Sequence, residues 1–140
     1  MSNRANEEVI ADLNRLFAEE VEASLRYLHL LNAVRGIDRL TIEPVLKEGF
    51  AETIQHAEVI ARKIRSLGHV PRLDINLSCP PDPLTGEEAL RQALTVEEAA
   101  LEAYHDVLSR VEGDVSLEEF VRAQIAIESE HVAELRELLM

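Results

Sequence analysis

The sequence predicts an all-α fold, an antiparallel four-helix bundle with one long crossover between the second and third helices. Apolar residues recur every three or four positions through four long segments, which is the period of an amphipathic helix. The five Gly and five Pro lie mostly between those segments. A long linker, residues 69–84, separates the second segment from the third, whereas the other two connections are only a few residues long.

The first helix is expected from about Asn6 to Val34, with Gly36 stopping it. We call the residues that repeat along one side of a helix, and that should face the bundle core, its seam. The seam of the first helix is Leu13, Leu16, Glu20, Tyr27 and Leu31.

The second helix is expected from about Thr41 to Leu67. Thr41 suits the N-cap, Pro44 is tolerated in the first turn, and Gly68 ends the helix. Its seam is Leu46, Phe50, Thr53, His56, Ile60 and Ile64.

The third and fourth helices each open with the Ser/Thr-x-x-Glu pattern of a capping box. One box spans residues 85–88 and begins a helix that runs to about Val111, and the other spans residues 116–119 and begins a helix that runs to the end. The third seam is Leu90, Leu94, Glu97, Leu101, Tyr104 and Leu108. The fourth is Val121, Ile125, Glu128, His131, Leu135 and Leu138.

The lengths of the connections indicate how the helices pack. Short turns make helices one and two antiparallel, and likewise three and four. The second helix should be ~40 Å long at about 1.5 Å per residue. The linker of residues 69–84 can reach ~55 Å when extended, so it can start the third helix at the opposite end of the bundle.

Composition limits the class of protein. The 140 residues are expected to form one domain, residues 1–140, and 27 acidic against 14 basic residues give a net charge of −13. That charge argues against a nucleic-acid surface and favours attraction of cations. No apolar run approaches the ~20 residues that span a bilayer, and no signal peptide is evident, so we expect a cytoplasmic protein.

The two halves of the chain repeat a polar pattern. Tyr27 follows Glu20 by seven positions, and Tyr104 follows Glu97 by seven. A seam histidine comes 36 positions after the first glutamate and 34 positions after the second. Each half is therefore predicted to be a hairpin carrying a glutamate, a tyrosine and a histidine on its seam.

Carboxylates and histidines on seams point to a metal centre. An ionised carboxylate in a core is costly unless it is compensated, and the seams contain no Lys or Arg. Residues at i and i+3 share a helix face, so one ion can be reached by both Glu128 and His131. Carboxylate and imidazole ligands suit iron or manganese, with zinc as an alternative. The predicted metal ligands are Glu20, His56, Glu97, Glu128 and His131.

Each of these residues also has an ordinary structural interpretation. A lone histidine on an apolar seam, such as His56, is more often a hydrogen-bonded core residue than a ligand. Tyr27 and Tyr104 are expected to pack in the core with their hydroxyls hydrogen-bonded. The metal interpretation is favoured because all four helices contribute polar groups at one depth of the bundle.

The chain resembles the bacterioferritin-type members of the ferritin-like superfamily from about Val9 to the C-terminus. The most specific stretches are VIADLNRLFAEEVEASLRYLHLL, AETIQHAEVIARKIRSLGHVP, EALRQALTVEEA and IAIESEHVAEL. The resemblance implies an oxygen-dependent di-iron ferroxidase centre at the five predicted ligands. It makes Glu128 and position 53 the bridging carboxylates, and it places Tyr27 next to the centre.

The chain departs from that family pattern at three places. Position 53, where the family has a glutamate, is Thr53; Glu52 is the candidate replacement, although it lies about 100° round the helix. Position 54, where bacterioferritins have the methionine that binds haem, is Ile54, so we expect no haem. The chain stops at Met140, without the fifth helix of 24-subunit cages, so we expect a homodimer or a larger homo-oligomer.

Three functions compete at this stage. The leading one is an iron-binding protein that oxidises Fe²⁺ with O₂ or peroxide for storage or detoxification. The second is a non-catalytic binding or structural bundle with a degenerate metal site, which Thr53 favours. The third is a rubrerythrin-like peroxide reductase, although the chain has the single Cys79 and no CxxC pair.

Overall fold

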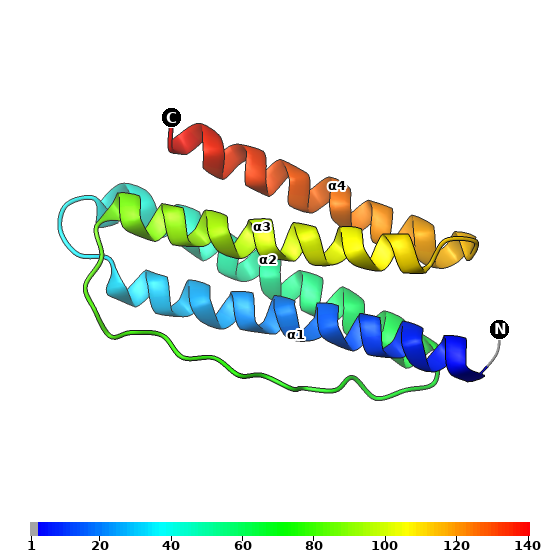
Figure 1. The fold of residues 1–140 in the computed structure, drawn as a ribbon. Coiled ribbons are helices and arrows are strands. Elements are labelled where there is room, and N and C mark those ends of the chain that lie inside the picture. The colour runs from blue at the N-terminus through cyan, green and yellow to red at the C-terminus, as the bar shows by residue number, and fades with distance from the viewer. Residues whose placement is uncertain (1–2) are drawn as a thin grey trace.

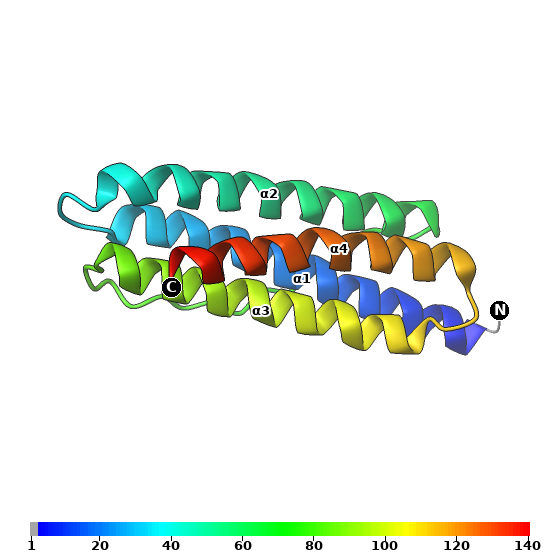
Figure 2. The same cartoon turned by 90° about the horizontal axis from the view of Figure 1, so that it is seen from above.

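The computed structural model describes residues 3–140, with side chains from residue 6 onward, and folds into a bundle of four long helices (Figure 1). They are α1 (Asn3–Ala33), α2 (Arg39–Ser66), α3 (Gly86–Arg110) and α4 (Val115–Leu138). Short turns join α1 to α2 and α3 to α4, so each pair is an antiparallel hairpin (Figure 2). The predicted all-α four-helix bundle is confirmed.

The segment between α2 and α3 runs the length of the bundle beside α1 (Figure 1). Near its start, the backbone N–H of Arg72 donates to Asn14 Oδ1 over 2.7 Å. Near its end, Leu84 forms a parallel bridge with Val34, at the opposite end of α1. The long crossover predicted from the linker length is therefore confirmed, and it starts α3 at the end of the bundle where α2 also starts.

Two of the predicted N-caps are wrong. The second helix begins at Arg39 with Asp38 as N-cap, and the hydroxyl of Thr41 donates to the Asp38 carbonyl over 3.1 Å instead of capping. As a result Pro44 lies in the second turn. The helix is preceded by a turn of 3₁₀ type, in which each backbone N–H donates to the carbonyl three residues earlier, beginning with Arg39 N to Gly36 O.

The fourth helix begins at Val115, with Asp114 rather than Ser116 as N-cap. The carboxylate of Asp114 accepts from Leu117 N over 3.2 Å, and Glu118 accepts from Gly113 N over 2.6 Å. Aspartate is among the preferred N-cap residues, and here it also places a negative charge at the helix N-terminus, where the helix dipole favours it. The predicted cap of α3 is confirmed: Thr85 accepts from Glu88 N over 3.1 Å.

The core consists of two apolar clusters with a polar layer between them. One cluster lies towards the α3–α4 turn and includes Leu13, Leu16, Ile60, Ile64, Tyr104, Val107 and Val121. The other lies towards the α1–α2 turn and includes Tyr27, Leu30, Leu46, Leu90 and Leu135. The polar layer consists of the buried residues Glu20, Ser24, Thr53, His56, Glu97, Gln124 and Glu128. Leu138 was predicted to be a seam residue but is 55% exposed, because Leu135 and Leu139 are the residues at this end of the chain that pack against the second cluster.

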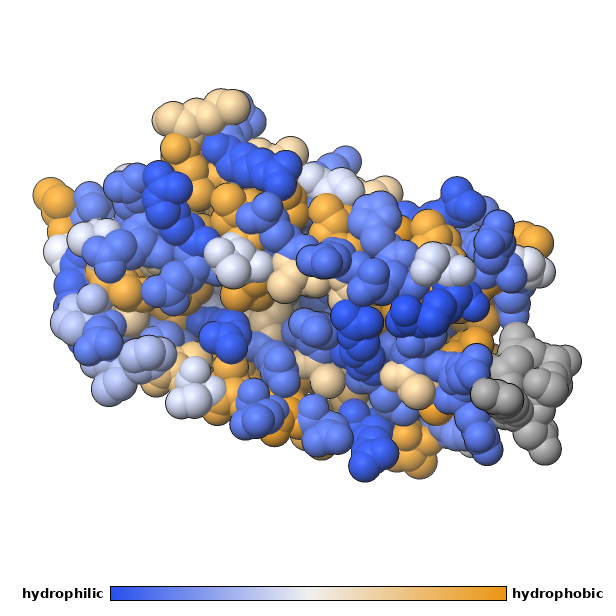
Figure 3. Space-filling view, in the orientation of Figure 1, coloured by the Kyte–Doolittle hydropathy of each residue, from blue (hydrophilic) through white to orange (hydrophobic). Residues whose placement is uncertain are grey.

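The outer surface is that of an acidic, amphipathic bundle. In the face shown in Figure 3, hydrophilic residues dominate and apolar side chains are scattered among them. Among residues 3–140, no helix combines the length and the apolar character needed to cross a bilayer.

Gly49 on α2 is required by close packing against α1. A Cβ atom at this position would lie 2.3 Å from Cε1 of Tyr27, a separation that non-bonded carbons do not tolerate. The ring of Tyr27 is buried and its hydroxyl is hydrogen-bonded, so it has little freedom to move away. The absence of a side chain at Gly49 therefore lets Tyr27 pack directly on the backbone of α2.

We predict that Gly49→Ala lowers the free energy of unfolding by about 1–3 kcal/mol, the usual cost of overpacking a core. This would reverse the gain of roughly 1 kcal/mol that Ala gives over Gly in an open helix position. Urea unfolding followed by circular dichroism measures the change in the free energy of unfolding, and Gln55→Ala, at an exposed position of the same helix, is the control. A Gly49→Ala protein as stable as the control would contradict this account of the packing.

Candidate metal centre

All four helices contribute a functional group to the polar layer. Glu20 comes from α1, His56 from α2, Glu97 from α3 and Glu128 from α4, and none of them is more than 6% exposed. His131, one turn after Glu128, is 13% exposed at its side chain. The five side chains that the sequence predicts as ligands therefore lie in or at the edge of one layer of the bundle.

The two tyrosines hold the glutamates of the opposite hairpin. The hydroxyl of Tyr27 on α1 donates to Glu97 Oε1 on α3 over 2.6 Å. The hydroxyl of Tyr104 on α3 donates to Glu20 Oε1 on α1 over 2.9 Å. The repeated Glu–Tyr spacing in the sequence thus becomes a reciprocal pair of hydrogen bonds between the two halves of the chain.

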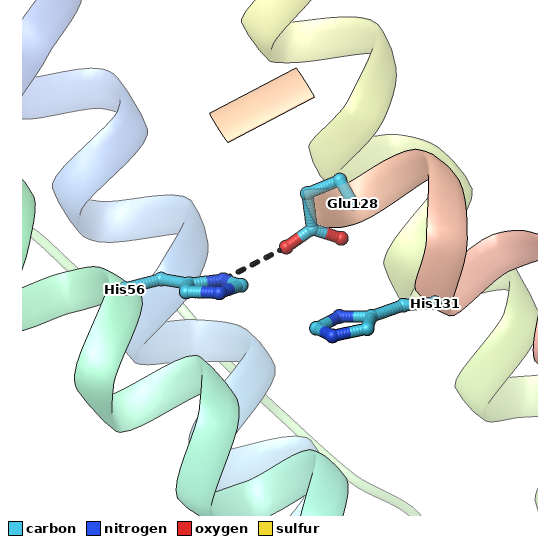
Figure 4. A group of neighbouring side chains, drawn as sticks. All are labelled: His56, Glu128 and His131. Atoms are coloured by element: carbon cyan, nitrogen blue, oxygen red, sulfur yellow. Dashed lines mark hydrogen bonds and ion pairs between the residues drawn. The ribbon is translucent and has the colours of Figure 1, made fainter. Parts of the chain in front are cut away.

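The histidines connect α2 and α4. His56 Nδ1 lies 3.0 Å from Glu128 Oε1 and 3.6 Å from Glu20 Oε2. The rings of His56 and His131 stack with their centroids 5.6 Å apart and an interplanar angle of 8° (Figure 4). The two imidazoles and the carboxylate of Glu128 consequently face a common space between the helices.

Thr53 lies on the seam but does not turn its hydroxyl to the other polar groups, whereas Glu52 lies on the flank and contacts a predicted ligand. The side chain of Thr53 is buried on the seam, but its hydroxyl donates to the carbonyls of Gly49, at 3.0 Å, and Phe50, at 2.9 Å. Glu52 lies on the flank with its side chain 32% exposed, yet its Oε2 reaches His131 Nε2 over 2.8 Å. The carboxylate that α2 brings to the layer is therefore Glu52.

Burial dominates the electrostatics of the layer. It raises the pKa of Glu97 to about 8, helped by neighbouring Glu128 and opposed by the hydrogen bond from Tyr27. Burial also raises the pKa of Glu20, and the interactions with His56 and Tyr104 oppose it. For His56, burial alone would lower the pKa, but the hydrogen bonds and charges of Glu128 and Glu20 raise it to about 10.

Unsatisfied oxygen atoms show what the layer lacks. Among the side chains from residue 6 onward, three buried oxygens have no hydrogen-bond partner: Glu20 Oε2, Glu128 Oε2 and Gln124 Oε1. An unpartnered carboxylate oxygen in a core is costly, and a cation is the partner that satisfies it best. His56, Glu128 and His131 each offer a ligand atom, and these atoms lie within 4.8 Å of one another. The residues present therefore fit a bound metal ion.

Sequence reasoning missed Gln124. It lies one turn before Glu128 on α4 and is only 6% exposed. The helical period from Val121 to Glu128 passes through Gln124, so its position on the seam could have been recognised. We expected an apolar seam residue at Ile125, which is half-buried beside it.

The fold and the layer define a class of protein, a four-helix bundle with a carboxylate and histidine cluster in its core. Residues 10–140 match the family model of the ferritin-like domain, and the chain belongs to that family. The resemblance noted in the sequence is thereby confirmed. A search of curated proteins gives no match.

Solved structures with the same fold include ferritin-like and bacterioferritin-related proteins. A ferritin-like, diiron-carboxylate protein of Bacillus anthracis str. Ames is 27% identical, with 100% of both chains covered and a TM-score of 0.85. The bacterioferritin-related protein of Bacteroides fragilis, a dodecameric thioferritin, is 26% identical over 96% of this chain and 85% of that one, with a TM-score of 0.80. A Dps protein from Bacillus brevis, 16% identical with a TM-score of 0.88 and 100% coverage of both chains, shares the fold.

We predict that a redox-inert cation such as Zn²⁺ stabilises the protein through this layer. A ligand that binds only the folded state at a hundred times its Kd adds about 2.7 kcal/mol to the free energy of unfolding. Glu128→Ala should abolish most of that gain, whereas Glu134→Ala, an exposed carboxylate on the same helix, should keep it. Thermal unfolding with and without Zn²⁺ measures the effect. Equal stabilisation of both variants would place the binding elsewhere.

Proposed function

We propose that the polar layer holds two iron ions and that the protein oxidises Fe²⁺ with O₂ or peroxide, as part of iron storage or detoxification. The observation that carries the proposal is the set of buried carboxylates with unpartnered oxygens at Glu20 and Glu128, beside two stacked imidazoles. Membership of the ferritin-like family supports it. So does the similarity to a diiron-carboxylate protein.

The described contacts suggest how the ligands divide. Glu20 and His56 lie together and would hold one ion. Glu97 and His131, on the other two helices, would hold the second ion. Glu128 would serve both ions, because it offers a ligand atom within 4.8 Å of ligand atoms on both His56 and His131. Iron suits this mixture of carboxylate and imidazole, and manganese or zinc would compete for it.

Iron is the substrate in this proposal. Two Fe²⁺ ions give one electron each to O₂, which takes up two protons and leaves as hydrogen peroxide while the iron becomes Fe³⁺. The chain contributes position and environment. The tyrosine hydroxyls orient the carboxylates of Glu20 and Glu97, and the two apolar clusters separate the layer from water at the two ends of the bundle.

One observation favours a second function, a metal-binding bundle without catalysis. The hydroxyl of Thr53 is committed to its own helix, so α2 places no carboxylate at the fully buried position. In that case one ion would bind at Glu20, His56 and Glu128, and the site would lack the second iron that a two-electron reaction requires.

We also propose that the protein assembles as a homodimer or a larger homo-oligomer. Large apolar side chains remain exposed on both helices of the first hairpin, among them Leu25, Leu28 and Ile54. The related protein of Bacteroides fragilis is a dodecamer. Multi-angle light scattering should give a mass of at least twice the 15.7 kDa of one chain, and a monomer at micromolar concentration would contradict the proposal.

The catalytic proposal predicts a fast oxidation of two Fe²⁺ per chain. When Fe²⁺ is added in steps to metal-free protein in air, near-ultraviolet absorbance should rise quickly and change slope at two irons per chain. Glu128→Ala should lose the fast phase, whereas the exposed-residue variant Glu134→Ala should keep it.

A break at one iron per chain, with metal still bound, would replace the ferroxidase proposal with the non-catalytic metal-binding bundle. Oxidation at the same rate in the Glu128→Ala protein would show that the reaction takes place outside the polar layer.

A further inference from the structure

A charge imbalance remains in the polar layer if it takes up two divalent ions. Two such ions carry four positive charges, and the fully buried carboxylates Glu20, Glu97 and Glu128 supply three negative charges once all three are ionised as metal ligands. No other acidic residue among residues 6–140 is as deeply buried as these three. A dry core disfavours an uncompensated charge, so a fourth carboxylate is expected to approach the layer.

Glu52 is in the position to supply that charge. Its Oε2 contacts His131 Nε2 at 2.8 Å, and His131 in turn stacks on His56. Its side chain is 32% exposed, so the carboxylate enters the layer from the rim of the bundle rather than from the core.

Thr53 has no comparable role. Both of its hydrogen bonds go to carbonyls of its own helix, at Gly49 and Phe50. A hydroxyl used in this way is a neutral packing group, and its removal changes no charge in the layer.

The two ends of the layer consequently differ. At the buried end, Glu20, His56 and Glu128 are each at most 6% exposed. At the rim end, Glu52 and His131 are partly exposed and contact each other directly. The contact within each end joins α2 to α4, and the stacked rings of His56 and His131 connect the two ends. These two helices pack less closely on each other than α1 packs on α2 or α3 on α4.

We propose that Glu52 is the α2 carboxylate of a second, rim metal position, shared with His131 and Glu97, and that metal at this position exchanges with solvent while the buried position retains its ion. This inference rests on the proposed dinuclear centre. The contact between Glu52 and His131 supports it, and the buried Glu128 Oε2 has no hydrogen-bond partner among the described residues that would compete with a cation.

Mn²⁺ binding tests the proposal without relying on catalysis. Electron paramagnetic resonance of free Mn²⁺, with isothermal titration calorimetry, should show two ions per wild-type chain. Glu52→Gln keeps the shape of the side chain and removes its charge. It should leave the affinity for the first Mn²⁺ ion unchanged and lower the affinity for the second by at least about tenfold. That is the smallest loss usually seen when a residue supporting a metal ligand is removed.

Two matched controls isolate the role of Glu52. Glu48→Gln removes an exposed carboxylate one turn earlier on α2 and should leave both ions in place. Thr53→Ala removes the hydroxyl next to Glu52 in the sequence and should also leave both ions bound. Circular dichroism checks that both variants fold.

The outcomes separate this inference from the proposed function. Two ions in the wild type and two equally tight ions in Glu52→Gln would overturn the role of Glu52 and leave the dinuclear centre standing. Loss of the second ion in Thr53→Ala or Glu48→Gln would also overturn it. A wild-type chain that binds no Mn²⁺ in a manner sensitive to Glu128→Ala would refute both proposals.

Discussion

The burial of carboxylates in the middle of an aliphatic core is the constraint on which this structure depends. Glu20, Glu97 and Glu128 interrupt what would otherwise be a continuous apolar interior, and they do so at one level between two apolar clusters. The groups around them compensate for that burial in part: two tyrosine hydroxyls and one imidazole donate to the carboxylates, and two carboxylate oxygens are left without a hydrogen-bond partner within the described part of the chain. The carboxylate oxygens that lack a hydrogen-bond partner are the physical reason to expect metal ions here.

The internal repeat explains why both halves of the chain are needed. Tyr27 of the first hairpin serves Glu97 of the second, and Tyr104 of the second serves Glu20 of the first. Neither hairpin could satisfy its own glutamate in this way. The long crossover beside α1 allows this arrangement, because it starts α3 at the end that brings the two glutamates to the same level.

Much of the fold and of the layer could be predicted from the sequence, because helical period places residues on a face without knowledge of their partners. The period identified the seam positions of Glu20, Glu97 and Glu128 and the four helices, all of which the structure bears out. It did not reveal that Glu52 reaches His131, because a position about 100° from the seam is placed by side-chain length and local packing rather than by period. The starts of α2 and α4 were missed because they depend on the preceding turn: α2 begins after Asp38 without a side-chain cap, and α4 is capped by the carboxylate of Asp114.

Anomalous X-ray diffraction from crystals loaded with Mn²⁺ tests most directly whether the layer is a dinuclear metal centre. We expect two anomalous peaks in the core, about 3.5–4 Å apart as in other two-metal sites, one beside Glu20 and His56 and the other beside Glu97 and His131. Peaks confined to surface carboxylates, with an undisturbed pair between His56 and Glu128, would contradict it.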